Sequence, residues 1–324
     1  KVKSEERLRL LLVLTVADIK GVGPDIWNDW KGSLISELYL KSLDVLKETD
    51  IDKNTIESNR NSKELLKIHL SQNNIKISEI KKYCNNYYNN YWEVFNFDTI
   101  VSHFEIFTKM KNDLNKFKIH LFNESKLQAT ELLVIAPDHH GLFSLISGLV
   151  AASGYDVVSA KIITRSDGYA LDTFFIQNKE RHPISEDYLR KKLIRTITKG
   201  LEGDFNIEKE LSKKWEEIPS RFRAVKAPTR VIVDNETSDA YTILDIKCKN
   251  APGVLYKITK VITSLGLQIN TANVSTYGDR VVDIFYLKNA FGSKLDDDIT
   301  IKKVKSSILE ELKEIDFVNK VIKS

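Results

Sequence analysis

Cysteine is scarce in this 324-residue sequence, which has only Cys84 and Cys248. Two cysteines cannot build a disulfide framework or a CxxC metal site, and such low usage is typical of a reducing compartment. A large excess of charge of one sign is also missing, since 49 Lys and Arg residues face 45 Asp and Glu residues, for a net charge of +4. The two signs are interspersed, so charge gives no reason to expect nucleic acid as a partner.

Long hydrophobic runs are missing as well. The longest, over residues 8–19, is interrupted by Arg9 and Asp18. It is too short to span a bilayer, so we expect no transmembrane helix and no membrane partner. No signal-peptide pattern opens the sequence, and we therefore expect a cytoplasmic location.

Methionine is nearly absent, because Met110 is the only one and no initiator is present. Removal of an initiator normally needs a small second residue, and Lys1 is not small. We therefore expect the chain to be a piece of a longer protein. A site whose other half lies upstream would then be incomplete in this chain.

The first 120 residues are expected to be mainly helical. Ser4 can cap a helix with apolar residues at the helical period, and the pattern breaks at residues 21–24 before a second helix over about 25–46. A polar loop should follow over 50–61, and segment 61–120 should be helical in pieces. Its aromatic residues are most simply packing residues: Tyr87, Tyr88, Tyr91, Trp92, Phe95 and Phe97.

The pattern changes after residue 128, where short apolar segments alternate with turn residues. These segments predict strands over 131–136, 155–164 and 169–177, and helices over 142–152 and 184–200. A final strand would complete a βαββαβ unit. Residues 230–233 predict a further strand in the segment that follows.

An internal repeat supports this fold. Gly141 matches Gly253 and Gly154 matches Gly266, each 112 positions further on, and Asp172 matches Asp283 after a one-residue shift. Glycine at a turn and at a helix end suits backbone conformations that few other residues tolerate. The sequence therefore predicts an α+β protein, with a helical N-terminal segment followed by two ferredoxin-like βαββαβ domains.

The first strand of each copy ends in a turn that leads into a helix, at residues 138–142 and 250–254. Such a turn presents helix N-terminal amides beside a short polar side chain, a combination that can hold the carboxylate of an amino acid. Both turns resemble the Asp-Arg-Pro-Gly turn of ACT domains, small regulatory modules that bind amino acids at paired interfaces. The first turn has His140 in place of the proline, and the second has Asn250 in place of the acid.

This resemblance implies a set of residues that bind an amino acid. A polar residue two positions after the helix-ending glycine should also face the ligand, which adds Asp156 and Gln268. The implied set is Asp138, Gly141, Leu142, Phe143, Asp156, Asn250, Gly253, Val254, Leu255 and Gln268. An alternative stays open, in which these are turn and strand residues without a ligand.

The resemblance extends beyond the ACT pair to the bifunctional uridylyltransferase/uridylyl-removing enzymes of nitrogen signalling. Four groups of residues carry it: Thr15–Lys20 with Gly23-Pro24 and Trp27-Asn28; Tyr91-Trp92 with Phe97 and His103; Pro228–Val231; and Thr276–Arg280 with Val282–Tyr286. They resemble the end of the HD domain, the connector, the inter-ACT segment and the second ACT hairpin. The implied parts are the end of the HD domain over 1–48, a helical connector over 49–128, ACT domains over 129–211 and 241–324, and a linker with a strand over 212–240.

The resemblance implies that the full-length protein has three parts. A nucleotidyltransferase domain transfers UMP to the PII protein, an HD phosphohydrolase domain removes it, and an ACT pair senses glutamine. The chain retains only the end, so we expect its C-terminal regulatory part, inactive alone and with no cofactor of its own. The full-length enzyme should use Mg or Mn and act on PII, and the ACT domains could support self-association. A non-catalytic tandem ACT module that binds an amino acid or mediates assembly is the alternative.

Asp18 matches the last metal-ligand aspartate of HD domains. It lies at helical spacing from Leu11, Leu14 and Thr15, so we expect it to point inward, where a carboxylate needs a partner or a metal. The HD pattern also needs a His-Asp pair, which this sequence lacks. Asp18 is therefore expected to be one ligand of an incomplete metal site.

Overall fold

The computed structural model describes most of the chain beyond residue 61 and part of the segment before it. The described residues are 2, 4–23, 31, 32, 35, 36, 38, 39, 42, 43, 46, 62–73, 75–110, 117–124, 128–217, 229–277 and 280–321. The chain divides into two compact units, residues 1–112 and 113–324.

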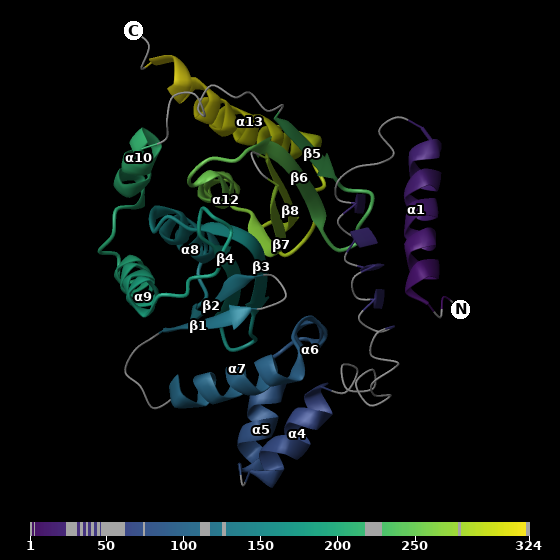
Figure 1. The fold of residues 1–324 in the computed structure, drawn as a ribbon, viewed down its shortest axis with the longest axis vertical. Coiled ribbons are helices and arrows are strands. Elements are labelled where there is room, and N and C mark those ends of the chain that lie inside the picture. The colour runs from purple at the N-terminus through teal and green to yellow at the C-terminus, as the bar shows by residue number, and fades with distance from the viewer. Residues whose placement is uncertain are drawn as a thin grey trace. The chain divides into compact units, whose positions relative to one another are not determined.

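The described part of the first unit is helical (Figure 1). Its helices are α1 (Glu5–Gly21), α4 (Ser62–Gln72), α5 (Ile77–Asn85), α6 (Asn89–Val94) and α7 (Phe97–Met110). The Ser4 hydroxyl accepts a hydrogen bond from the Arg7 backbone N–H at 3.3 Å and so caps α1. The predicted first helix and the later helical pieces are confirmed, whereas the helix expected over 25–46 lies mostly outside the described residues.

An aromatic cluster forms the core of helices α5 to α7. Tyr91 is fully buried, stacks on Tyr87 at 3.8 Å, and its hydroxyl lies 3.1 Å from Nδ1 of His103. Tyr83 packs edge-on against Phe104 in the same cluster. The packing interpretation is therefore confirmed for Tyr87, Tyr91, Trp92 and Phe95, which are buried, but Tyr88 is exposed.

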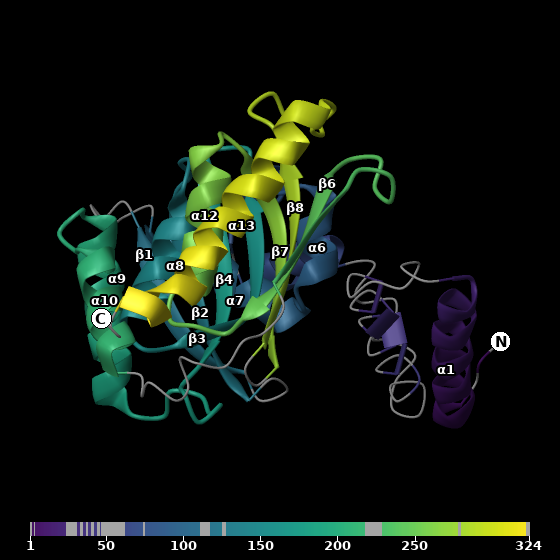
Figure 2. The ribbon, with the colours of Figure 1, turned by 90° about the horizontal axis from the view of Figure 1, so that it is seen from above.

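The second unit contains two copies of one arrangement of strands and helices. The first copy comprises β1 (Lys118–Glu124), β2 (Ala129–Pro137), α8 (Leu142–Ala152), β3 (Asp156–Thr164), β4 (Tyr169–Gln177), α9 (Asp187–Leu201) and α10 (Ile207–Glu217). The second comprises β5 (Arg230–Asp234), β6 (Thr242–Lys249), α12 (Val254–Ser264), β7 (Gln268–Tyr277), β8 (Arg280–Lys288) and α13 (Asp298–Val321). Helices flank one face of each sheet (Figures 1 and 2).

Both sheets are four-stranded and antiparallel, with strand orders β1-β2-β4-β3 and β5-β6-β8-β7. The predicted α+β class with two ferredoxin-like domains is confirmed. The sequence placed the fourth strand of each sheet after the second helix, whereas in the structure it comes before the first helix, as β1 or β5. Residues 118–120 are therefore strand and not helix. The strand expected over 230–233 is present as β5 and belongs to the second sheet.

The two copies pack edge to edge. Strands β3 and β7, the last in each sheet order, lie side by side, and α8 packs against α12. One continuous apolar core contains side chains of both copies. Each of these two strands has an irregularity at the matching place, between Val157 and Ser159 in β3 and between Ile269 and Thr271 in β7. This pairing covers two sheet edges that would otherwise be open to other chains.

Within the described residues, no helix combines the length and apolar character needed to cross a membrane.

Candidate functional site

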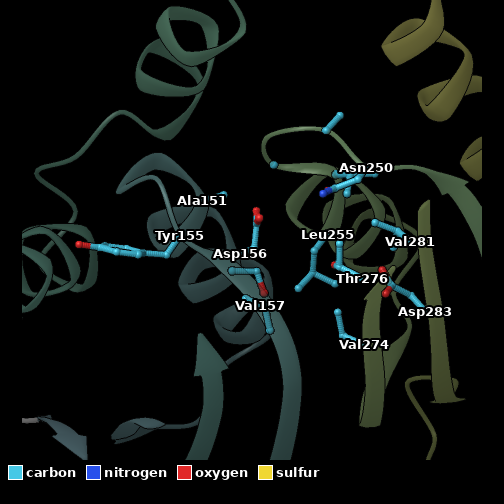
Figure 3. A pocket seen from close by; sticks show the side chains of 14 residues that line it. Ala151, Tyr155, Asp156, Val157, Asn250, Leu255, Val274, Thr276, Val281 and Asp283 are labelled. Atoms are coloured by element: carbon cyan, nitrogen blue, oxygen red, sulfur yellow. The ribbon is translucent and has the colours of Figure 1, made fainter. Parts of the chain in front are cut away.

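A cleft lies where the turn before α12 meets β3 of the first copy (Figure 3). The cleft is partly open to solvent. The first copy lines it with residues from α8 and from the start of β3, and the second with the turn and strands β7 and β8. The polar lining residues are Ser147, Tyr155, Asp156, Asn250, Thr276 and Asp283.

The turn beside the cleft depends on Gly253. Its φ of +76° is in the left-handed region that favours glycine, and a Cβ there would lie 2.7 Å from Leu211 Cδ1. Gly253 is also the N-cap of α12, and no side chain caps this helix. The first-turn amides of Leu255 and Tyr256 have no partner within the helix, so the turn presents donors suited to an anion.

Asp156 reaches the cleft from the first copy. It starts β3 just before the irregularity at Val157, and its side chain is half-buried. Burial raises the pKa of this carboxyl, although the positive charges of Lys179 and Arg181 oppose the shift. Burial therefore disfavours the negative charge of Asp156, and a positive or hydrogen-bond-donating group in the cleft would stabilise it.

Asp283 lies on the second side of the cleft and is completely buried. Neither of its carboxylate oxygens has a hydrogen-bond partner of normal geometry among the described residues. Burial raises its pKa to about 8, and the Ser275 backbone N–H opposes this shift only in part. In the sequence Asp283 is recognised only as the repeat match of Asp172, but an acid between Val282 and Ile284 in an apolar strand is itself a sign of a functional residue.

The matching position in the first copy is Asp172, and its surroundings differ. It is also buried, and its pKa is raised well above the usual value by burial and by the nearby charge of Asp138. Asp138 in turn accepts a hydrogen bond from the Thr164 hydroxyl at 3.2 Å. Because Asn250 stands at the place of Asp138 in the second copy, Asp283 has no such neighbouring acid.

His140 gives the first turn a contact that the second turn lacks. Its Nε2 lies 2.7 Å from the backbone oxygen of Thr263 at the end of α12, so this nitrogen carries the proton and donates it. A Cβ on Gly141 would lie 3.2 Å from the Thr263 side chain. The first turn is therefore held against α12. This contact lies at the place that corresponds, in the repeat, to the cleft beside the second turn.

The cleft brings together five of the ten predicted ligand residues: Asp156, Asn250, Gly253, Val254 and Leu255. The other five do not line it. Asp138 and Gln268 are exposed, Leu142 and Phe143 are buried in the core, and Gly141 forms the N-cap of α8. Phe143 stacks on Phe174 with ring centres 5.1 Å apart, which is a packing contact.

Asp18 does not point inward as expected, because its side chain is exposed on α1. Leu11 and Leu14 on the same face are also exposed, and Leu8 is the one buried residue of this helix. The helical spacing was right, but no described part of the chain covers that face. Among the described residues, no group of three or more His, Cys, Asp or Glu side chains could hold a metal ion.

The two ferredoxin-like copies are joined at their edge strands, and a cleft lies between the glycine turn of one copy and the edge strand of the other. This arrangement defines a paired ACT-domain protein. The model of the ACR family N-terminal ACT domain matches residues 237–314, which cover most of the second copy.

The bifunctional uridylyltransferase/uridylyl-removing enzyme of Rhodospirillum rubrum is 38% identical over 294 residues, which cover 91% of this chain and 31% of that enzyme. The enzyme of the same name from Gluconobacter oxydans is 34% identical over 317 residues, covering 96% of this chain and 33% of the relative. The chain belongs to this enzyme family and corresponds to its C-terminal part. It spans about a third of the length of the curated relatives it matches.

Proposed function

We propose that the chain is the glutamine-sensing regulatory part of a bifunctional PII uridylyltransferase/uridylyl-removing enzyme and that the cleft is its amino-acid site. The observation that carries the proposal is the cleft itself. It joins the uncapped N-terminus of α12, the amide of Asn250 and the carboxylate of Asp156 around one space.

Each of these groups suits a different part of glutamine. The first-turn amides of α12 would hold the α-carboxylate. Asn250 would accept a hydrogen bond from the α-ammonium group. Asp156 would accept one from the side-chain amide, which glutamate cannot offer because its side chain ends in a second carboxylate.

The first turn supports the cleft in this proposal and does not form an equal second site. His140 holds that turn on Thr263, and Asp138 is engaged by Thr164. We therefore propose one main glutamine site for each chain, formed by the second turn and β3.

In the full-length enzyme, glutamine at this cleft would set the balance between UMP transfer to PII and UMP removal. That enzyme would work in the cytoplasm with Mg or Mn. The rival function is a tandem ACT module that only mediates assembly, and it requires no ligand in the cleft.

We expect L-glutamine to bind this chain with a dissociation constant at or below about 1 mM, which corresponds to about −4 kcal/mol. L-glutamate should bind at least about tenfold more weakly, because its side-chain carboxylate would meet Asp156. Isothermal titration calorimetry at pH 8 measures both constants.

The variant Asp156→Asn supplies the matched control, since an Asn side chain keeps the shape and removes the charge. It should reduce the preference for glutamine over glutamate. No heat at millimolar glutamine favours the assembly module, and equal affinity for the two amino acids refutes the role given to Asp156.

A further inference from the structure

Among the described residues, the charged side chains that line the cleft are all acidic. Asp156 and Asp283 come from the two copies, and the other lining residues are neutral, with no Lys, Arg or His among them. Figure 3 shows the two carboxylates on opposite sides of the space, with Leu255 between them. A site with acidic walls and no cation among its described lining residues favours a ligand group that carries positive charge, because such a group stabilises the carboxylate form.

Asp283 is the more unusual of the two acids. Its side chain is completely buried, neither oxygen has a hydrogen-bond partner of normal geometry among the described residues, and the Ser275 backbone N–H offsets the effect of burial only in part. Buried polar groups in folded proteins are nearly always satisfied, so an unpaired carboxyl beside a cleft calls for a partner.

The described neighbours of Asp283 in the sheet and along the cleft supply no counter-charge. Strand β6 places Ile246 opposite it and strand β7 places Val274, while α12 brings Leu255 to the cleft. The other titratable groups that line the cleft are Asp156 and Tyr155, both from β3 or the residue before it. Neither of them can neutralise a carboxylate.

We propose that the Asp283 carboxylate binds the α-ammonium group of an amino-acid ligand, while the N-terminus of α12 holds the α-carboxylate. This inference rests on amino-acid binding at the cleft. It adds the charge that Asn250, a neutral residue, cannot provide to an ammonium group.

Binding then includes a proton transfer to solvent. In the empty cleft the buried carboxyl holds its proton at neutral pH, because its pKa is about 8. An entering ammonium group stabilises the carboxylate form, and the carboxyl proton leaves to the buffer while the ligand keeps its own charge. Each bound ligand should release up to one proton, and affinity should rise roughly tenfold for each pH unit up to about 8.

The first copy offers a matched comparison in Asp172. It occupies the repeat position of Asp283 and is equally buried, but it does not line the cleft. The variants Asp283→Asn and Asp172→Asn therefore make the same chemical change, and only the first removes the proposed ammonium partner.

The test is calorimetry on the full chain and on both variants, with L-glutamine, N-acetyl-L-glutamine, L-glutamate and a panel of other amino acids. Titrations at pH 7 in phosphate and in Tris separate the heat of binding from the heat of proton release. We expect proton release with the wild-type chain and no binding of the acetylated ligand, which lacks the ammonium group. Asp283→Asn should lose at least about tenfold in affinity at pH 8 and all proton release, and Asp172→Asn should keep both.

The results separate this inference from the proposed function. Glutamine binding that is unchanged in Asp283→Asn overturns the role of Asp283 and leaves glutamine sensing intact. Binding of another amino acid with proton release that depends on Asp283 supports the inference and rejects glutamine as the ligand. Binding of none of the amino acids overturns both, and thermal melting of each variant verifies that it is folded.

Discussion

Replacing Asp283 with Asn is expected to raise the free energy of unfolding at pH 8 by a few kcal/mol. Burial raises the pKa of this carboxyl from the ordinary 3.8 to about 8 in the folded chain. The buried carboxyl therefore does not destabilise wild type below about pH 4. As the pH rises to about 8, this carboxyl ionises in the unfolded chain but not in the folded one, and wild-type stability falls. One pKa unit corresponds to about 1.4 kcal/mol, so the shift sets an upper bound of roughly 6 kcal/mol, and the polar Asn side chain reduces the gain.

Urea unfolding of wild type and Asp283→Asn at pH 5 and pH 8 measures this difference. The advantage of the variant should be small at pH 5 and larger at pH 8. Asp167→Asn is an opposite control, because the hydrogen bond and charge of Arg165 lower the pKa of Asp167 despite partial burial. An advantage of Asp283→Asn that does not grow with pH would show that this carboxyl is not held in a buried, unpaired state.

Replacing Gly253 with Val should abolish glutamine binding and destabilise the second unit. A non-glycine residue in the left-handed region costs about 1–2 kcal/mol. The added Cβ would also lie 2.7 Å from the buried Leu211 side chain, and overpacking of this kind costs about 1–3 kcal/mol more. The distorted turn would then misplace the α12 amides.

Gly168 provides the matched control for this change. Its φ of +80° is close to that of Gly253, but a Cβ there meets no atom within 4 Å. Gly168→Val should therefore lose only the backbone term, about 1–2 kcal/mol, and keep its glutamine affinity. Urea unfolding and calorimetry on both variants decide the matter, and equal losses of stability at the two glycines would contradict the contact with Leu211.

Much of the second unit could be predicted from the sequence, because its pattern is local. The spacing of apolar residues predicts the helix over 142–152, and the turn glycine predicts the hairpin around residue 168. The internal repeat shows each of these patterns a second time. The order of strands within the sheet could not be found this way. The fourth strand of each sheet can come before or after the other three in the chain, and the choice depends on pairing between distant segments. The local pattern of residues 118–124 and 230–234 does not show which strand each of them pairs with.

The candidate site was predicted in part for the same reason. The turn at Asn250 and Gly253 has a recognisable local pattern, and Asp156 follows from its spacing to Gly154. Their combination across two copies depends on the edge-to-edge packing of β3 and β7, which no single segment encodes. The contact of His140 with Thr263 joins residues 123 positions apart, so the substitution was visible in the sequence but its effect was not.

A crystal structure of the chain with L-glutamine tests the central claim most directly. The account predicts one glutamine in the cleft between the second turn and β3. Its α-carboxylate should contact the amides of Leu255 and Tyr256, its ammonium group should contact Asp283, and its side-chain amide should contact Asp156. Glutamine bound at the turn over 138–143, or an empty cleft at saturating glutamine, would contradict the account.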